Sequence, residues 1–465
     1  MNPPLRNIFL FYQIMKKYLT ILAFLMPVLA SAQTTVLSLE ECLESAEKYN
    51  RTLHNAALNI QMAEEQKKEA FTKYFPEISA NVMAFVAFDK MIQQDGYFPM
   101  ELAALEQINP NLAALAGQPF AINELDKGMA LMATITQPLF VGGQIVNGNK
   151  LANLGKEVAE LQSKLQTEEV LQKITENYYQ IVKIKYNMAT IKSAQAQLHA
   201  IYKEVKNYVD AGVTTRNDLI KVRLELQQLS SDSLKTANAH HVMCLLLAQQ
   251  IGKAGESIDV KDGIDFRKED PAYLYTSPDQ AVSYREELAL AQKNVDAHKL
   301  KVRMEVGKNL PTVAVGVSLT HMSLGGLSDG AKSIIDSKNN NGMAFGTVSL
   351  PLSAWWGGSK AIRREKLALE LSENQMKDAR EQLIIDTEAS WMALEEAHLQ
   401  IGIAITSVME ARENMRMSYD KYRMGTEILS DLLESETLLR KSEDRLSEAR
   451  ANYLIKRADY IRKTR

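Results

Sequence analysis

Cysteine is scarce in this chain, and that scarcity excludes a small domain held together by several disulfides. Cys42 and Cys244 are the only cysteines among 465 residues. An exported protein can form a disulfide, but the sequence does not show whether two distant residues meet in space. A Cys42–Cys244 bond and two free thiols therefore both stay open.

Motifs of common enzymes are also missing. The sequence contains no Gly-x-Ser-x-Gly nucleophile turn and no His-Glu-x-x-His zinc motif. The nearest approach to a phosphate-binding loop ends at Gly155-Lys156, but its spacing is too long and an acid follows the lysine. His240, His241 and Cys244 could offer metal ligands one helical turn apart, although His240 falls on a heptad seam, which favours packing. We expect neither an enzyme nor a cofactor or metal.

The sequence has one marked apolar run, near its beginning. Lys16-Lys17 precedes the stretch Leu19 to Leu29, and Ala30-Ser31-Ala32 follows it. A basic segment, an apolar segment and small residues in this order are typical of a secretory signal peptide. The run is shorter than the roughly 20 residues of a membrane-spanning helix. We predict a signal peptide at residues 1–32, with Met15 as an alternative start.

An excess of positive charge is absent as well. The formal net charge is −3, and removal of Arg6, Lys16 and Lys17 with the signal peptide, which contains no acid, would change it to −6. A nucleic-acid-binding protein would show a basic face. We therefore expect no nucleic acid partner.

What the sequence does contain is an internal duplication. Several turn and loop residues recur with a common offset of 213 residues. Chance matches rarely keep one offset over such distances, and a unit of this length is a duplicated half-molecule rather than a solenoid repeat. The corresponding residues are Pro138 and Pro351, Gly212 and Gly425, and Asp218 and Asp431.

The duplication divides the chain after the signal peptide into three parts. Residues 33–251 are predicted to form the first repeat and residues 278–465 the second. Each repeat would consist of a helix, two strands and a long helical hairpin. Residues 252–277, which contain Gly, Asp, Lys and Pro, join the repeats and are expected to form a small equatorial element.

Four segments alternate between apolar and polar residues with a period of two, which predicts β-strands. They cover residues 78–88, 130–139, 312–320 and 343–350. At about 8–11 residues, each has the length of a tilted membrane-spanning strand. The intervening residues 89–129 and 321–342 are predicted to be exposed loops. In the third strand the predicted lipid-facing set is Val313, Val315, Val317 and Leu319, and the opposite set is Thr312, Gly316, Ser318 and Thr320.

The alternative interpretation of these segments is four strands of a soluble sheet. Four strands alone would make a poor soluble core beside so much helix. The sequence therefore favours strands that lie in a membrane.

Helical patterns fill most of the remaining chain. Residues 38–73 predict one helix, which ends before Pro76. After each strand pair, Gly-Gly is followed by a proline-free stretch, residues 143–211 and 359–424, with apolar residues in helical steps. Gly212 and Gly425 end these stretches as C-cap signals, and heptad-patterned helices return after them. Each half should thus end in a long antiparallel hairpin.

This order of elements resembles that of the TolC family of outer-membrane efflux proteins. The resembling pieces are the two Pro-Leu…Gly-Gly segments that follow a strand, the segment Tyr422 to Leu432, and the segment Ala451 to Ile455. No single motif is specific to the family, but the duplicated order extends over residues 38–463.

The resemblance implies a mainly α-helical fold with a membrane β-barrel. Three subunits with four strands each would close a twelve-stranded barrel in outer-membrane lipid, and the helices would continue it as a tunnel into the periplasm. Such a homotrimer exports drugs, toxic small molecules or, in type I secretion, proteins, together with a periplasmic adaptor protein and an inner-membrane pump. The hairpin tips, Val209–Asp218 and Arg423–Asp431, would contact the adaptor.

The resemblance also implies a gate at the hairpin ends. Asp431 and Glu434 match an acidic pair that narrows the periplasmic entrance, while Tyr422 and Asp218 match residues of a latch between the hairpins. Independently of the resemblance, positions three apart share a helix face, so three subunits would assemble the acids into one ring that favours cations. Lys221 stands where the first repeat would match Glu434, so only the second hairpin offers a doubled ring.

A protein of another class, a periplasmic adaptor or a structural coiled-coil protein, also uses long helical hairpins. An adaptor would show one hairpin flanked by small β-domains, without strand pairs between helices. Two hairpins and two strand pairs favour the channel.

Overall fold

The computed structural model describes residues 34–88, 93–107, 109–123, 127–261, 270–325, 336–352 and 354–464. The predicted signal peptide, residues 1–32, lies outside these ranges. The chain divides into two compact units, and each unit draws on both halves of the sequence. The first consists of Met1–Gln61, Val158–Gln292 and Gln375–Arg465, and the second of Met62–Glu157 and Lys293–Asn374.

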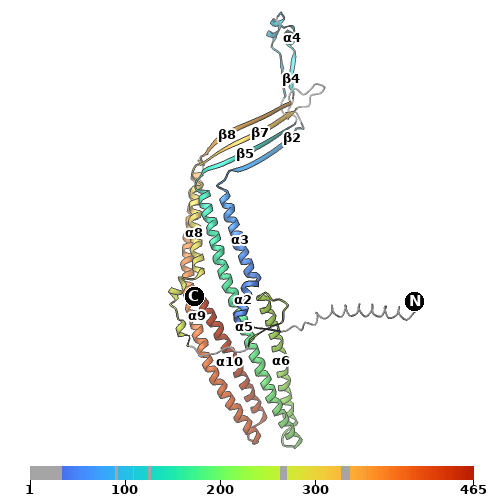
Figure 1. Cartoon of the computed structure of the whole chain (residues 1–465), viewed down its shortest axis with the longest axis vertical. Helices are drawn as coiled ribbons and strands as arrows, with labels where there is room; N and C mark the ends of the chain where they lie inside the picture. Colours follow the sequence, from blue (N-terminus) through green and yellow to red (C-terminus); the bar gives the residue numbers. More distant parts are fainter. Residues whose placement is uncertain are drawn as a thin grey trace, which may run out of the picture. The chain divides into compact units, whose positions relative to one another are not determined.

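The second unit contains a four-stranded sheet. Its strands are β2 (Glu77–Val86), β5 (Lys127–Val141), β7 (Thr312–Gly325) and β8 (Asp336–Ser349). They lie in the order β2-β5-β7-β8 (Figure 1), and every neighbouring pair is antiparallel. The strand pair of the first half of the chain thus joins that of the second half through β5 and β7.

The strands are longer than the alternation predicted. β5 has 15 residues and β7 and β8 have 14 each, whereas β2 has 10. The prediction of a loop at residues 321–342 is therefore wrong at both ends, because His321 pairs with Asn340 and Ser323 with Lys338. The added part of β8 is polar and shows no apolar alternation. Backbone pairing with it extends β7 over residues 321–325, where Met322 and Leu324 lie on the opposite face from Val317 and Leu319.

The predicted loop at residues 89–129 also contains regular structure. Strands β3 (Gln93–Tyr97) and β4 (Pro119–Asn123) pair as an antiparallel ribbon. Between them lie the 3-10 helix η2 (Met100–Leu105) and the short helix α4 (Pro110–Ala113). Pro110 and Pro119 are the first residues of α4 and β4, and Gly96 lies within β3, so these residues did not prevent regular structure.

The strand register brings the apolar alternations onto one face. Ile78 pairs with Ile135, Ile135 with Val317, and Val317 with Ala344. The opposite face carries Thr134 and Ser318 but also larger apolar residues, among them Met132 of β5 and Phe345 of β8. The predicted apolar sides of β2, β5 and β7 therefore lie on one face, whereas β8 directs Met343 and Phe345 to the other.

Gly316 lies on the face opposite to Val317, in close contact with the Phe345 ring of β8 and the backbone of β5. A β-carbon at this position would stand 2.5 Å from the Phe345 ring and 2.7 Å from the Ile135 carbonyl oxygen. The Phe345 side chain occupies the space that a larger residue would need, so glycine is required here.

Long helices form most of the rest. The first hairpin consists of α5 (Gln144–Asp210) and α6 (Arg216–Gln250), and the second of α9 (Ala354–Arg423) and α10 (Leu429–Thr464). Shorter helices are α7 (Pro278–Val282) and α8 (Glu286–Gly307). None of the described helices combines the length and the apolar content needed to cross a membrane.

Two helix boundaries differ from the predictions. Residues 38–73 form two helices, α2 (Leu39–Tyr49) and α3 (Arg51–Thr72). The side chain of Asn50 accepts hydrogen bonds from the backbone N–H groups of Thr52 and Leu53, so Asn50 ends one helix and caps the next. In addition, α9 begins at Ala354, so Gly357-Gly358 lies inside its first turns instead of before it.

Apolar cores hold the first unit together. One core joins α5, α6, α9 and α10 toward the hairpin ends. A second core joins α2, α5 and α6 to a parallel strand pair, β1 (Thr35–Leu37) with β6 (Ile258–Val260). Residues 252–277 thus contribute β6 and the 3-10 helix η3 (Pro271–Leu274).

Both cysteines lie in the second core. They are buried free thiols, and burial raises the pKa of Cys42 to about 12 and that of Cys244 to about 11. The structure therefore contains no Cys42–Cys244 disulfide.

Candidate functional site at the hairpin ends

Both hairpins turn on the same hydrogen-bonded motif. Gly212 follows α5 with φ of 75° and Gly425 follows α9 with φ of 72°. The N–H of Gly425 donates to the Tyr422 carbonyl and that of Thr426 to the Lys421 carbonyl, and the first turn repeats this pattern. A glycine with positive φ thereby satisfies the last carbonyls of the helix. The two turns are equivalent and lie 213 residues apart in the sequence.

Asp218, a predicted latch residue, lies in the first turn of α6 and forms hydrogen bonds with the residues that precede this helix. Its carboxylate accepts hydrogen bonds from Thr214 Oγ1 at 2.8 Å and Thr215 Oγ1 at 2.9 Å, and Lys221 Nζ lies 3.5 Å away. Burial by itself would raise the pKa of Asp218, but the two hydroxyls and Lys221 hold that pKa below its usual value. Thr215 caps the start of α6. At the equivalent position before α10 stands the apolar Ile428, so the second hairpin does not repeat this cap.

The predicted gate residues Asp431 and Glu434 lie in the first turns of α10. Both are exposed, whereas Leu432, Leu433 and Ser435 beside them are buried. The burial of their neighbours directs the two acids to one outward face of the helix. This is the arrangement that an acidic ring requires of each subunit.

Tyr422, the other predicted latch residue, is buried at the end of α9. Its ring lies 6.2 Å from that of Tyr208. Its hydroxyl has no hydrogen-bond partner among the described residues. Burial, and then the charges of Asp218 and Glu204, raise the pKa of Tyr422 to about 12. The charge of Asp218 thus contributes to the raised pKa of Tyr422, but no hydrogen bond joins the two residues within the described part of the chain.

A carboxylate that sequence reasoning missed joins the two hairpins. Glu204 of α5 accepts hydrogen bonds from Tyr208 Oη at 3.1 Å and from Tyr419 Oη at 3.0 Å. Arg423 Nε lies 3.3 Å from the same carboxylate. Because Tyr419 and Arg423 belong to α9, this group, hereafter the Glu204 link, ties the first hairpin to the second.

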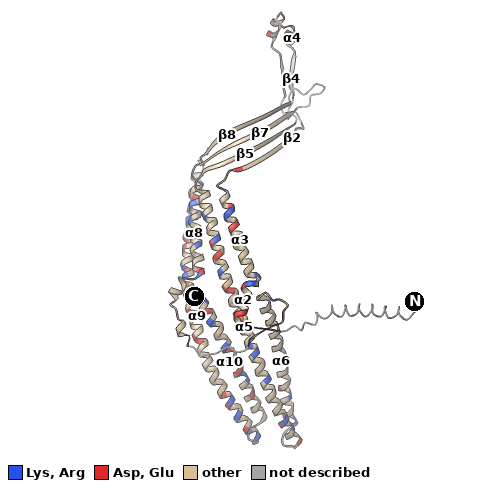
Figure 2. Cartoon of the chain, in the orientation of Figure 1, with Lys and Arg blue, Asp and Glu red and all other residues tan. Residues whose placement is uncertain are grey.

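A weaker contact also connects the hairpins. Lys221 Nζ of α6 donates to Ser430 Oγ of α10 at 3.0 Å. Within the second hairpin, Ser418 donates to the carboxylate of Glu427. Figure 2 shows charged residues along the helices and few on the four strands of the sheet.

The local sequence offered one weak signal for Glu204. Tyr208 follows it by four residues, which places the two side chains on one helix face. The decisive partner, Tyr419, stands 215 residues away in the sequence. Only the tertiary structure brings these residues together.

A cavity of about 510 Å³ lies among α5, α9 and α10, and Glu436 lines it. Glu436 is only 3% exposed. Its pKa is raised to about 7, mainly by burial; the charge of Arg440 lowers the pKa, and the charges of Glu225 and Glu443 add to the rise. Arg412 and Arg416 of α9 also line the cavity.

We predict that Glu436→Gln stabilises the protein at pH 8 and not at pH 4. The folded-state pKa of Glu436, about 7, exceeds its ordinary value of 4.5. Its stabilising contribution is therefore complete below pH 4.5 and is lost as the pH rises to about 7. A neutral glutamine does not lose this stability, so at pH 8 the variant should gain about 3 kcal/mol in the free energy of unfolding relative to the unaltered protein. Thermal unfolding of the variant and of the unaltered protein at each pH measures the difference. An equal gain in stability at pH 4 and at pH 8 would contradict a raised pKa of Glu436.

Of the three residues that the sequence offered as possible metal ligands, the structure brings His240 and Cys244 together. It adds Asp259 of β6 and leaves His241 exposed outside the group. Of the described residues, this is the one group of three or more such side chains with donor atoms close enough to share an ion.

Comparisons with known proteins match this architecture. No family model matches the chain. The outer membrane protein TolC of Escherichia coli (strain K12) is 21% identical over 270 residues, which cover 56% of this chain and 55% of TolC. The chain thus matches about half the length of that curated relative.

Solved structures match over a greater length. The outer membrane protein VceC of Vibrio cholerae has a TM-score of 0.69 at 14% identity, and the match covers 92% of this chain and 96% of VceC. CusC has a TM-score of 0.72 at 11% identity, with 92% of each chain covered. The CmeC outer membrane channel of Campylobacter jejuni has a TM-score of 0.67 at 14% identity, with 92% and 85% covered.

The chain has the fold of these outer-membrane proteins. The resemblance to the TolC family, inferred from the duplicated order of elements, is confirmed at the level of the fold. These similar proteins are membrane proteins and channels rather than enzymes.

Proposed function

We propose that this chain is one subunit of a trimeric channel in the outer membrane that extends into the periplasm. It exports drugs, toxic small molecules or proteins with a periplasmic adaptor and an inner-membrane pump. The observation that carries the proposal is the four-stranded sheet with its broad exposed apolar surface, whose edge strands β2 and β8 pair with no further strand among the described residues.

The strand directions support closure of the sheet into a barrel. All neighbouring pairs are antiparallel in the order β2-β5-β7-β8, so the two edge strands run in opposite directions. The β8 edge of one subunit can therefore pair antiparallel with the β2 edge of the next. Lipid tolerates no unpaired strand edge, and three copies would close an even-numbered barrel.

The apolar face is the proposed lipid surface. In the single chain, Ile78, Val82 and Val86 of β2 are more than 60% exposed, and Leu319 of β7 is 59% exposed. Such a broad exposed apolar surface is rare on a soluble monomer. Lipid would cover it, while the smaller and more polar residues of the other face would line the pore.

Purification tests the proposal directly. We expect the protein in the outer-membrane fraction as a detergent-resistant trimer that conducts ions in planar bilayers. Recovery of a soluble periplasmic monomer without conductance would refute the channel. It would favour the adaptor or structural coiled-coil protein instead.

We predict that Val317→Arg reduces trimer assembly in the membrane. Val317 lies on the apolar face beside Ile135 and Ala344, and an arginine there would cost about 2–4 kcal/mol near the bilayer midplane. Thr320→Arg, on the opposite face of the same strand, is the matched control. Ser318 is unsuitable because it is only 7% exposed. Equal trimer yields of the two variants, measured by unheated gel electrophoresis, would contradict the assigned faces.

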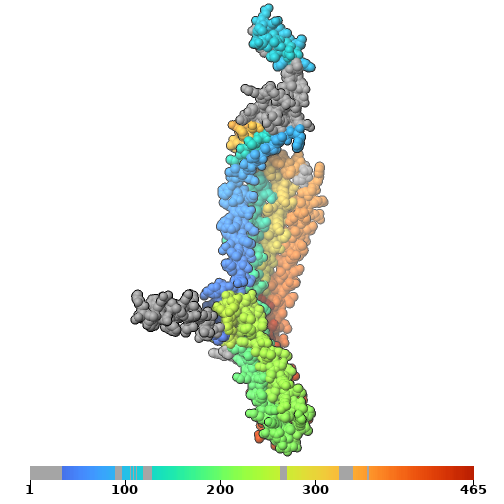
Figure 3. Space-filling view, turned by 90° about the vertical axis from the view of Figure 1, so that its right-hand side faces the viewer, coloured from blue at the N-terminus to red at the C-terminus, as the bar shows by residue number. Residues whose placement is uncertain are grey.

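The hairpin tips are the proposed docking surface for the adaptor. Several apolar side chains stand exposed there, which a helical adaptor tip could cover. Figure 3 shows the open surface at the end of the α5–α6 hairpin, in green. The exposed residues are Val213, Ile220, Leu224, Met424 and Ile428.

We predict that photo-crosslinkers at Val213 and Thr426 capture the adaptor. These positions are equivalent in the two turns and exposed, whereas the Thr214 hydroxyl is bound to Asp218. A crosslinker at Tyr97, in the β3–β4 ribbon of the second unit, is the control. Capture from Tyr97 alone, identified by mass spectrometry, would reverse the proposed orientation of the channel.

The proposed gate consists of the Asp431–Glu434 ring and the contacts that hold the hairpins together. The Glu204 link is the strongest of these contacts because it combines a carboxylate with two hydroxyls and a guanidinium. Tyr422 and Asp218 form the second part of the proposed latch. Opening would require both groups to separate.

A further inference from the structure

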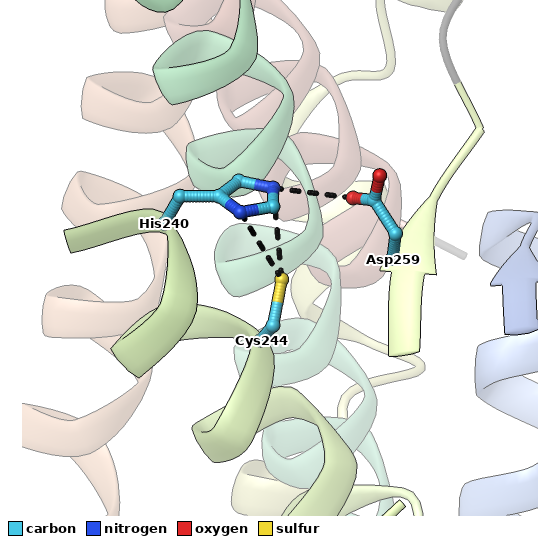
Figure 4. A group of neighbouring side chains, drawn as sticks. All are labelled: His240, Cys244 and Asp259. Carbon is cyan, nitrogen blue, oxygen red and sulfur yellow. Dashed lines mark hydrogen bonds and ion pairs between the residues drawn. The ribbon is translucent and has the colours of Figure 1, made fainter. Parts of the chain in front are cut away.

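His240, Cys244 and Asp259 form a compact group of three different donor atoms (Figure 4). His240 and Cys244 stand one turn apart on α6, and Asp259 extends from β6 toward the histidine ring. His240 Nε2 lies 3.2 Å from Asp259 Oδ1 and 3.7 Å from Cys244 Sγ. All three donor atoms lie within 4.8 Å of one another.

These separations fit a shared metal ion. In a tetrahedral zinc site the bonds to N and O are about 2.0–2.2 Å and the bond to S is about 2.3 Å. Neighbouring ligand atoms in such a site therefore stand roughly 3.3–3.6 Å apart. The observed separations from Nε2 differ from this range by little more than a tenth of an ångström.

We propose that His240, Cys244 and Asp259 bind a zinc ion. A thiolate excludes Ca²⁺ and Mg²⁺, which take oxygen ligands, and a mixed set of N, S and O donors suits the borderline-soft Zn²⁺. The side chains of His240 and Asp259 are 22% and 23% exposed. Solvent can therefore deliver the ion and supply a water as the fourth ligand.

The surroundings already orient the ligands. Lys185 Nζ of α5 lies 2.8 Å from Asp259 Oδ2, which leaves Oδ1 directed at the histidine. The backbone N–H of Val260 donates to Oδ1 at 2.8 Å. Such outer contacts hold ligands in place for a metal. With the thiolate and the carboxylate bound, Zn²⁺ and Lys185 leave one net positive charge at a site open to water.

Zinc binding would join α6 to the β1–β6 strand pair. One Zn²⁺ is taken up, and one proton is released from the Cys244 thiol to solvent. Neutral His240 binds the ion through the lone pair of Nε2. Asp259, Lys185 and His240 are the charged or titratable groups nearest the thiol, and Tyr178 and Cys42 share the core behind it. Because the thiol must lose its proton, binding strengthens as the pH rises.

Cobalt substitution of the full-length protein in detergent tests the site. We expect one Co²⁺ per chain, with the visible bands of tetrahedral cobalt and a thiolate charge-transfer band in the near ultraviolet, and Zn²⁺ should displace it. Cys244→Ser should abolish the charge-transfer band, and Asp259→Asn should weaken Zn²⁺ binding at least tenfold in competition with a chelating dye. His241→Ala and Cys42→Ser are matched controls that should bind as the unaltered protein does.

The pH dependence provides a second readout that a packing role would not produce. Zn²⁺ affinity should rise about tenfold from about pH 7.5 to about pH 8.5, as expected for release of one thiol proton. Circular dichroism shows whether each variant keeps its fold. Two results would overturn the proposal and leave the three side chains as a packing group. One is unchanged Zn²⁺ binding by Cys244→Ser, and the other is the absence of a thiolate band when Co²⁺ is added to the folded, unaltered protein.

Discussion

The double variant Asp431→Ala/Glu434→Ala will lose most of the cation selectivity of the channel in planar bilayers. Both acids are exposed on one face at the start of α10, and three subunits would bring six carboxylates to one constriction. Removal of such a ring should lower the cation-to-anion permeability ratio about tenfold or more, because each 1.4 kcal/mol of lost attraction is a factor of ten. Reversal potentials in a salt gradient measure the ratio.

The matched control for this experiment is Glu410→Ala/Glu413→Ala. These acids are also exposed and three residues apart, but they lie within α9, away from the turn. The control should retain its selectivity. An unchanged reversal potential in the first double variant would remove Asp431 and Glu434 from the pore.

Glu204→Gln will raise single-channel conductance more than Tyr422→Phe does. Glutamine cannot keep the ion pair with Arg423, and it accepts the hydroxyls of Tyr208 and Tyr419 more weakly. A hydrogen bond to a charged group contributes about 1.5–3 kcal/mol. Its loss from the closed state would therefore raise the ratio of open to closed channels by roughly tenfold or more. Tyr422→Phe removes a hydroxyl that has no hydrogen-bond partner in the described part of the chain.

Asp210→Asn is the control for this comparison. It changes an exposed acid at the end of α5, six residues after Glu204. A larger effect of Tyr422→Phe than of Glu204→Gln would show that the Tyr422–Asp218 pair, and not the Glu204 link, holds the entrance closed. Similar conductance of Glu204→Gln and Asp210→Asn would exclude the Glu204 link from gating.

Local patterns predicted the main elements of this fold. Alternating residues such as Val313, Val315 and Val317 identify a strand and its apolar side because successive side chains point to opposite faces. Gly212 and Gly425 mark the ends of α5 and α9 because a helix commonly ends at a residue with positive φ. These signals depend on a residue and its near neighbours, so one sequence is sufficient to detect them.

Other boundaries escaped detection because the responsible interactions leave no periodic signal. Asn50 divides the predicted first helix because its side chain caps α3 and binds the Gln250 carbonyl, 200 residues away. The extra length of β7 and β8 comes from backbone pairing of residues 321–325 with the polar start of β8. Neither feature changes the apolar pattern on which the prediction depended.

The sequence by itself therefore determined the duplicated order, the long hairpins and the apolar sides of β2, β5 and β7. Only the tertiary structure decided that β5 lies beside β7, that Glu204 meets Tyr419, and that Asp259 completes the group around His240. The difference has a physical cause. Secondary structure follows from periodic side chains along one segment, whereas these contacts depend on the packing of segments that are far apart in the chain.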